Sequence, residues 1–169
     1  TCALPIYDAD IPAAVQQVML SKFRNAGQTC VCANRIYVHD KIQSPFADAM
    51  ADQVKKLRVG DPASDQTQVG PLVDRQGLDK VSAHVEDALA KGATALVGGR
   101  RKEGLFFEPT LLTNVKAGMR ILEEETFGPV APLVGFSDEA EIIRAANNTP
   151  YGLAAYVWTR SEEHTSELQ

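Results

Sequence analysis

A cysteine in a turn is the first feature of this sequence whose type and position suggest chemistry. Cys30 follows Gly27 and Gln28 at the end of a candidate helix over residues 11–22, and a β-branched run over residues 36–38 comes soon after. Such a junction can hold a thiol at a fixed position on a rigid frame. A thiolate is an intrinsically strong nucleophile, so Cys30 is a candidate catalytic nucleophile. The alternative is a small buried side chain.

A second thiol, Cys32, stands two residues further along the chain and suggests redox chemistry. A neighbouring thiol can resolve a sulfenic acid at a reactive cysteine, which makes Cys32 a candidate redox partner of Cys30. A disulfide between residues so close strains the backbone, and plain burial of Cys32 is an equal alternative. No metal site is expected, because structural zinc needs four ligands and His39 is the only histidine nearby. We expect His39 and His84 to lie at the surface.

The remaining candidate site residues are one arginine and the residues of an acidic turn. Arg24 stands six residues before Cys30, and its guanidinium group can hold a carboxylate with two hydrogen bonds. The alternative for Arg24 is a solvated side chain at a helix end. Taken alone, the acidic turn indicates a solvated loop beside a core phenylalanine. The turn has the sequence Glu124-Glu125-Thr126-Phe127-Gly128-Pro129.

Two motifs in the chain resemble signatures of one enzyme family. The first is Gly-Gln-x-Cys followed by an arginine five residues later, and it comprises Gly27, Gln28, Cys30 and Arg35. The second is the run Glu-Glu-x-Phe-Gly-Pro over residues 124–129. Both resemble motifs of the aldehyde dehydrogenase superfamily, and residues 23–34 are most similar to its succinate-semialdehyde dehydrogenase branch. The resemblance covers nearly all of residues 8–159.

The resemblance implies a role for each candidate residue. Cys30 would attack the aldehyde carbonyl, Glu125 would bind the nicotinamide ribose, and Phe127 would pack beside the nicotinamide. Arg24 would bind the far carboxylate of the substrate. The cofactor would be NAD or NADP, and the substrate a small aldehyde that bears a carboxylate, with succinate semialdehyde as the expected example.

The resemblance also bears on the complete protein. The general base of the family is a glutamate that would lie before the first residue of this chain, so we expect the chain alone to be inactive. The complete protein is expected to be a homo-oligomer. Two alternatives stay open. One is a broad-specificity aldehyde dehydrogenase, and the other is a non-catalytic thiol-redox module that uses Cys30 and Cys32.

Helical and strand patterns alternate along the chain, which favours an α/β fold with a mostly parallel sheet and flanking helices. The family resemblance implies a partial catalytic domain of the aldehyde dehydrogenase fold. Pro109 suggests an irregular or edge strand, and Asp138 suggests a helix cap. Apolar periodicity predicts helices over residues 11–22, 44–57, 78–89 and 138–147. Strands are predicted over residues 36–38, 94–97, 106–112, 130–136 and 153–158, with a turn over 123–129.

The composition of the 169-residue chain argues against several classes of partner. A net charge of -5 without a basic stripe disfavours nucleic acid and anionic membrane surfaces, because both need clustered Lys and Arg. No apolar run approaches the roughly 20 residues of a membrane span. Three cysteines are too few for a disulfide scaffold and fit a reducing compartment. We therefore expect a cytoplasmic protein.

Both ends of the chain resemble translated adapter DNA. Residues 160–169 match one strand of a common sequencing-library adapter, and residues 1–6 match its reverse complement, with Tyr7 also compatible. Opposite strands of one oligonucleotide rarely encode both ends of a chain by chance. Residues 1–7 and 160–169 are therefore expected to be non-native, and residues 8–159 to be the partial catalytic domain. The alternative is a natural polar tail behind a short apolar start.

Overall fold

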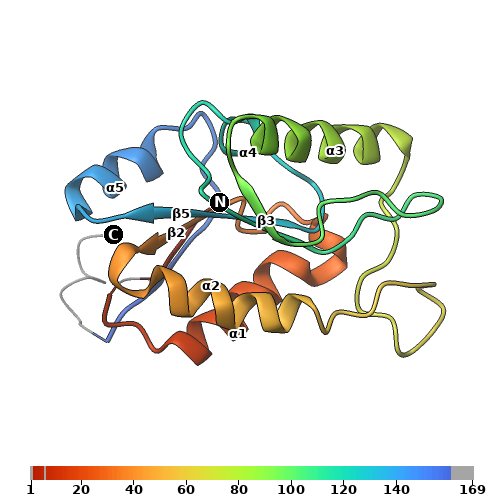
Figure 1. Cartoon of the computed structure of the whole chain (residues 1–169), viewed down its shortest axis with the longest axis horizontal. Coiled ribbons are helices and arrows are strands. Elements are labelled where there is room, and N and C mark those ends of the chain that lie inside the picture. Colours follow the sequence, from red (N-terminus) through yellow and green to blue (C-terminus); the bar gives the residue numbers. More distant parts are fainter. Residues whose placement is uncertain (1, 6, 161–169) are drawn as a thin grey trace.

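A six-stranded sheet forms the centre of the computed structural model, which describes residues 2–5 and 7–160 (Figure 1). The strands are β1 (Cys2–Pro5), β2 (Arg35–His39), β3 (Thr94–Val97), β4 (Thr110–Thr113), β5 (Val130–Phe136) and β6 (Ala155–Trp158). They lie in the order β3-β4-β5-β2-β1-β6, and every neighbouring pair is parallel except β3 with β4. The expected α/β class with a mostly parallel sheet is confirmed.

Helices cover both faces of this sheet. They are α1 (Ile11–Phe23), α2 (Asp40–Val54), α3 (Arg75–Ala90), α4 (Arg120–Glu123) and α5 (Glu139–Asn147), and a short 3-10 helix, η1 (Arg24–Gly27), follows α1. Helices α1 and α2 lie on one face, while α3, α4 and α5 lie on the other (Figure 1). None of the helices in residues 2–5 and 7–160 is both long and apolar enough to cross a bilayer.

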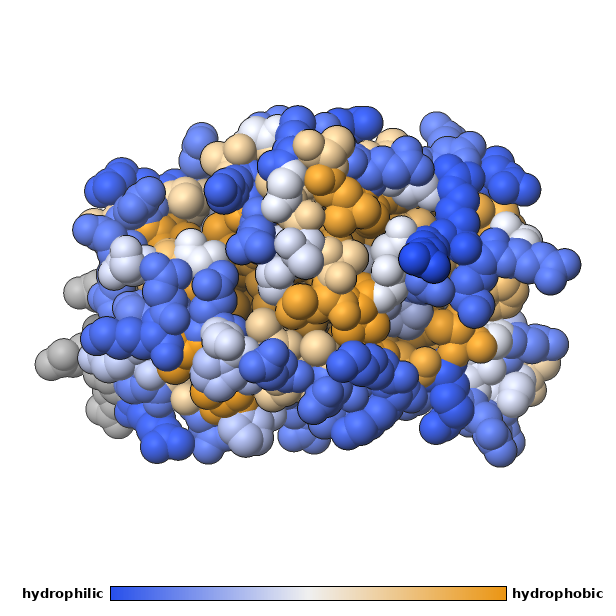
Figure 2. Space-filling view, viewed as in Figure 1, coloured by the Kyte–Doolittle hydropathy of each residue, from blue (hydrophilic) through white to orange (hydrophobic). Residues whose placement is uncertain are grey.

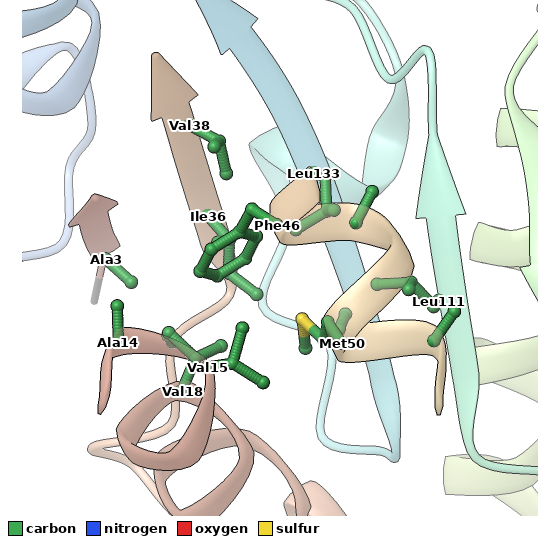
Figure 3. Close-up of a cluster of buried hydrophobic side chains, with 14 of the residues drawn as sticks. Ala3, Ala14, Val15, Val18, Ile36, Val38, Phe46, Met50, Leu111 and Leu133 are labelled. Carbon is green, nitrogen blue, oxygen red and sulfur yellow. The ribbon is translucent and has the colours of Figure 1, made fainter. Parts of the chain in front are cut away.

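The largest apolar cluster lies between the sheet and the helices α1 and α2. Phe46 and Met50 of α2 are fully buried in one cluster with Ile36 of β2 and Leu133 of β5 (Figure 3). Val18 of α1 joins them from the neighbouring helix. Phe46 and Met50 share one helix face because they are four residues apart, as the periodicity predicted.

The outward sides of the helices are polar. Hydrophilic residues cover α2 and α3 on the face drawn in Figure 2, and apolar surface lies between them, where β3 forms an edge of the sheet. Leu96 of β3 is 40% exposed at this edge. The helices therefore turn their apolar sides toward the sheet, as amphipathic helices do.

Aspartates cap three of the predicted helices, and one of them is Asp74, which accepts a hydrogen bond from the Gly77 amide at 2.7 Å at the start of α3. The carboxylate of Asp10 accepts a hydrogen bond from the Ala13 amide at 3.0 Å, at the start of α1. Asp138 accepts one from the Glu141 amide at 2.8 Å, at the start of α5. Such bonds satisfy amide donors that the first helical turn leaves unpaired. The predicted cap at Asp138 is confirmed.

The predicted bounds of α2 were wrong at both ends. The helix begins at Asp40 and ends at Val54, whereas the pattern predicted residues 44–57. Ring atom Nδ1 of His39 accepts a hydrogen bond from the Lys41 amide at 3.1 Å and caps the helix at its true start. Histidine is not one of the usual capping residues, so the sequence did not indicate this start.

Of the expectation of an irregular or edge strand at residues 106–112, the edge position was wrong, while residues 106–109 are irregular and hold only an isolated bridge between Phe107 and Arg101. Regular pairing begins only at Thr110, directly after Pro109, and β4 lies inside the sheet between β3 and β5. The proline therefore precedes the strand and leaves the hydrogen-bond ladder intact. Three elements were not predicted: β1, η1 and α4.

Both histidines that were expected at the surface are buried. His39 is 7% exposed and His84 is fully buried. His39 packs edge-on against the ring of Phe136, with ring centroids 5.2 Å apart. His84 lies on the inner side of α3, three residues after the buried Val81. The polar side chain of histidine therefore did not indicate exposure at these two positions.

Strand β1 consists of residues expected to be non-native. Cys2, Ala3 and Leu4 are buried, and the strand pairs with β2 on one side and β6 on the other. Tyr7 and Arg160, which belong to the same expectation, are also described, whereas residues 1, 6 and 161–169 lie outside the described residues.

Candidate active site

A left-handed turn brings the chain from α1 to Cys30. Asn25, Ala26 and Gly27 all have positive φ angles, of 52°, 54° and 73°. The Asn25 carbonyl accepts the amide of Gln28 at 3.0 Å, which closes the turn. Such backbone is costly for residues with a side chain, so the surrounding contacts must hold it.

The structure gives a physical reason for Gly27, the glycine of the first motif. A Cβ atom at this position would overlap the backbone carbonyl of Gly128, which belongs to the second motif. Only glycine therefore allows the two segments to approach this closely. The two motifs, far apart in the sequence, lie against each other in the fold.

Gln28 fixes the turn to a neighbouring loop. Its amide oxygen accepts a hydrogen bond from the Val73 amide at 2.9 Å, and its amide nitrogen donates to the Pro71 carbonyl at 3.2 Å. A side-chain amide is well suited to this task because it is both donor and acceptor. The glutamine of the motif thus positions the residues that lead to Cys30.

Cys30 lies at an open cavity of about 340 Å³, and its side chain is exposed. The wall of the cavity includes Glu125 from the second motif, Asn34, and the segment 149–153 that leads into β6. The structure therefore brings two predicted site residues, Cys30 and Glu125, to one cavity. This arrangement leaves the thiol accessible to a small molecule.

Cys32 has a different environment from Cys30. It is fully buried, and its sulfur lies 2.8 Å from the Thr29 hydroxyl and 3.8 Å from the Lys22 carbonyl. It is not among the residues that line the cavity. Cys30 and Cys32 are not joined by a disulfide in the structure.

A buried lysine beneath the cavity was not among the site residues predicted from the sequence. Lys22, at the end of α1, is fully buried and donates a hydrogen bond from Nζ to the Asn34 amide oxygen at 3.0 Å. Burial lowers the pKa of Lys22 to about 8, while electrostatic interactions with Cys32 and Glu125 act in the opposite direction. Lys22 thereby supports Asn34 at the cavity wall.

The acidic turn of the second motif begins at the end of α4. Glu124 accepts a hydrogen bond from Arg120 Nε at 2.9 Å and one from His84 Nε2 at 3.2 Å. These bonds lower the pKa of Glu124 to about 2. Glu125 and Phe127 are exposed, and Thr126 between them is buried.

Besides Cys32, two other predicted site residues do not line the cavity. Phe127 is 39% exposed, and Arg24 is exposed on η1. Arg35 does line it, and its guanidinium group donates to the Ala145 carbonyl at 3.2 Å and the Ala146 carbonyl at 3.0 Å, near the end of α5. The arginine of the first motif therefore braces the wall of the cavity.

No group of three or more His, Cys, Asp or Glu side chains in the described ranges is placed to hold a metal ion. Cys30 and Cys32 differ in burial, and His39 points its Nδ1 toward the start of α2. The lining of the cavity includes the thiol of Cys30, the carboxylates of residues 123–125 and the amide of Asn34.

A family model, described as the aldehyde dehydrogenase family, matches residues 6–169. The chain belongs to the aldehyde dehydrogenase family. The family assignment predicted from the two motifs is therefore confirmed. In this aldehyde dehydrogenase chain, the turn before Cys30 and the cavity wall are held by Gly27, Gln28 and Arg35. These contacts explain why the motif has these residue types around Cys30.

Curated relatives of this aldehyde dehydrogenase chain share about half of its residues. A glutarate-semialdehyde dehydrogenase of Pseudomonas putida is 50% identical over 153 residues, and an NADP(+) succinate-semialdehyde dehydrogenase of Escherichia coli is 50% identical over 155. A 3-sulfolactaldehyde dehydrogenase of Pseudomonas putida is 52% identical over 155 residues. Each match covers 90% of this chain and 32% of the relative. The chain thus spans about a third of their length.

A solved structure has the same fold. The crystal structure of an NADP-dependent enzyme from Escherichia coli superposes with a TM-score of 0.97 at 45% identity. The match covers 99% of this chain and 35% of that protein. The aldehyde dehydrogenase chain therefore has the arrangement of elements of one contiguous part of a larger enzyme fold.

Proposed function

We propose that the chain is the cysteine-bearing part of the catalytic domain of a longer NAD(P)-dependent aldehyde dehydrogenase, which oxidises succinate semialdehyde to succinate. The observation that carries the proposal is the exposed Cys30 thiol on a cavity that it shares with Glu125. The rigid turn before Cys30 supports it, because a nucleophile must be held in position to react efficiently. Residues 1–7 and 160–169 would be non-native additions to residues 8–159.

Cys30 would carry the covalent chemistry. Its thiolate sulfur forms a bond to the aldehyde carbon, and the carbonyl oxygen takes up the negative charge. After hydride has left that carbon, a thioester to Cys30 remains. Water then breaks the carbon–sulfur bond, which releases the carboxylic acid and regenerates the thiol, and a general base takes the proton from water.

The cavity residues fit a nicotinamide cofactor. Glu125 places an exposed carboxylate at the cavity wall, where it would accept hydrogen bonds from two ribose hydroxyls. Phe127, two residues later and also exposed, would pack beside the nicotinamide ring. When bound, NAD or NADP supplies the acceptor for the hydride.

Arg24 would select substrates with a negatively charged far end. It is exposed on the turn that leads to Cys30, and its guanidinium group can hold a carboxylate with two hydrogen bonds. The names of the three relatives refer to glutarate semialdehyde, succinate semialdehyde and 3-sulfolactaldehyde, and each of these aldehydes carries an acidic group. Glutarate semialdehyde is the second candidate substrate on the same grounds.

The 169-residue chain alone would oxidise no aldehyde. Glu124, one of the carboxylates at the cavity, is bound by Arg120 and His84, and its pKa is lowered to about 2, which makes it a poor proton acceptor. Glu125 has the role of binding ribose in this proposal. The family resemblance implies that the general base, a glutamate, comes from a part of the longer enzyme outside these residues.

Steady-state kinetics of the full-length enzyme test the proposal. The wild type should oxidise succinate semialdehyde with NAD or NADP, and Cys30→Ala should abolish this activity. Cys32→Ala is the matched control, because it removes a thiol two residues away that does not line the cavity, and it should keep most of the activity under reducing conditions. Equal losses in the two variants would refute the role of Cys30.

A further inference from the structure

A buried histidine on α3 contacts the loop that bears the proposed cofactor-binding residues. His84 is fully buried, and its ring lies between two side chains of the second motif. Nδ1 is 2.8 Å from the Thr126 hydroxyl, and Nε2 is 3.2 Å from Oε2 of Glu124. Both ring nitrogens of His84 thus contact side chains of the same loop.

The directions of both hydrogen bonds follow from the surrounding charges. Burial lowers the pKa of His84, and Lys80 and Arg120 lower it further, while Glu124 acts in the opposite direction. Glu124 stays ionised at neutral pH, since its pKa is about 2, and a carboxylate can only accept hydrogen bonds. Nε2 of the neutral ring therefore donates to Glu124, and Nδ1 accepts from the Thr126 hydroxyl.

The two contacts differ in how far they depend on His84. Glu124 is also held by Arg120, whose Nε and Nη2 donate to it at 2.9 and 3.4 Å. Thr126 is 1% exposed, and within the described part of the chain its hydroxyl is paired with His84. Loss of the ring would thus release Thr126 but leave Glu124 bound.

Thr126 lies between the two proposed cofactor-binding residues, Glu125 and Phe127. Burial alternates along the loop, with Glu125 and Phe127 exposed and Thr126 buried between them. In extended backbone, successive side chains point to opposite sides. The alternating burial places Thr126 on the inner side of the loop and Glu125 and Phe127 on the outer side.

The same helix also supports the end of the loop. A Cβ atom on Gly128 would overlap the side chain of Val81, which lies one helical turn before His84. The loop thus rests directly on α3 at two successive points.

We propose that His84 is a positioning residue, which, through its hydrogen bond to Thr126, holds Glu125 and Phe127 in the orientation that binds the nicotinamide cofactor. This inference rests on the proposed function. His84 touches neither substrate nor cofactor in it, and its effect is on cofactor affinity.

Two substitutions separate the two contacts of the ring. His84→Gln places an amide nitrogen near the site of Nε2 and keeps the bond to Glu124, but it loses the partner of Thr126. His84→Asn places an amide oxygen near the site of Nδ1 and keeps the bond to Thr126. Thr126→Val removes the hydroxyl at nearly constant volume and tests the same contact from the other side.

The measurement is the dissociation constant of NAD or NADP for the full-length enzyme and its variants. His84→Gln and Thr126→Val should each weaken binding roughly tenfold, and the double variant should be no weaker than either single variant. His84→Asn should retain near-native affinity. The KM for cofactor should rise in the weakened variants, while kcat at saturating cofactor changes less. His39→Asn, at a buried histidine that caps α2, is the control and should leave cofactor affinity unchanged.

The outcomes distinguish failure of this inference from failure of the proposed function. If the wild type binds neither NAD nor NADP, the proposed function is wrong. If the wild type binds and His84→Gln binds equally well, His84 has no positioning role. An equal loss in His84→Asn and His84→Gln would mean that ring packing, and not the bond to Thr126, is what matters. If His84→Gln does not fold, Thr126→Val decides alone.

Discussion

Gly27 and Gly128 join the two motifs of this chain, because the backbone of one occupies the space that a side chain of the other would need. Gly27 belongs to the turn that presents Cys30, and Gly128 belongs to the loop that bears Glu125. Their contact fixes the nucleophile relative to the proposed cofactor-binding loop. The geometry of the cavity therefore depends on a contact between two residues that carry no side chain.

The first prediction concerns this contact. Gly27→Ala should lower both the thermal midpoint and the activity of the full-length enzyme, because φ is positive and the added Cβ meets backbone that cannot easily move. Gly118→Ala is the matched control, since Gly118 has a φ of 84° and no atom within 4 Å of an added Cβ. It should cost about 1 kcal/mol of stability and leave activity intact. Equal effects of the two substitutions on activity would contradict the role of the contact.

The second prediction concerns substrate choice. Arg24→Ala should lower the ratio of kcat/KM for succinate semialdehyde to kcat/KM for butanal by roughly 10- to 100-fold, because a charge-assisted pair with the carboxylate is lost. Arg24→Lys keeps the charge but not the two-pronged geometry, and it should give an intermediate ratio. An unchanged ratio in Arg24→Ala would remove Arg24 from the substrate site.

The third prediction concerns the buried Lys22. Its pKa in the folded protein is about 8, below the value of about 10.4 for a solvated lysine. The folded state therefore binds fewer protons than the unfolded state between these values, and the free energy of unfolding should rise by about 3 kcal/mol as the pH increases through this window. The Lys22 ε-carbon resonance, identified by its absence in Lys22→Met, should titrate near pH 8. A midpoint near 10.4 would show that the amine is solvated.

The fourth prediction concerns thiol access. Iodoacetamide should modify Cys30 in the native protein long before it modifies Cys32, since Cys30 is exposed and Cys32 is fully buried. Peptide mapping after partial alkylation gives the order. Modification of Cys32 first would contradict the placement of the two thiols. A reversible Cys30–Cys32 pair without aldehyde oxidation would instead favour the thiol-redox alternative.

Much of the fold could be predicted because local signals and tertiary packing agree. Strand β5 was predicted with its observed bounds, Val130–Phe136, since a short apolar run between turn residues is typical of a buried strand. The start of α2 could not be predicted, because its cap is the ring of His39. The position of Pro109 was misjudged because a proline directly before a strand and one within it look alike in sequence.

The sequence predicted only those residues of the candidate site that belong to a motif. The motifs indicated Cys30 and Glu125, and the structure places both at one cavity. Lys22 and His84 were missed because charged and polar residues are usually exposed. Their spacing held a signal: Lys22 follows Val15 and Val18 on the buried face of α1, and His84 follows Val81 by one helical turn. A polar residue in phase with an apolar stripe indicates a buried group with a partner.

The covalent intermediate on Cys30 is the most direct test of the account. The full-length enzyme is mixed with succinate semialdehyde and NAD or NADP, quenched in acid during turnover, digested and analysed by peptide mass spectrometry. The account predicts a succinyl group on the peptide that contains Cys30, located at that sulfur and absent from the Cys30→Ala variant. A succinyl group on Cys32, or turnover without any acylated cysteine, would contradict it.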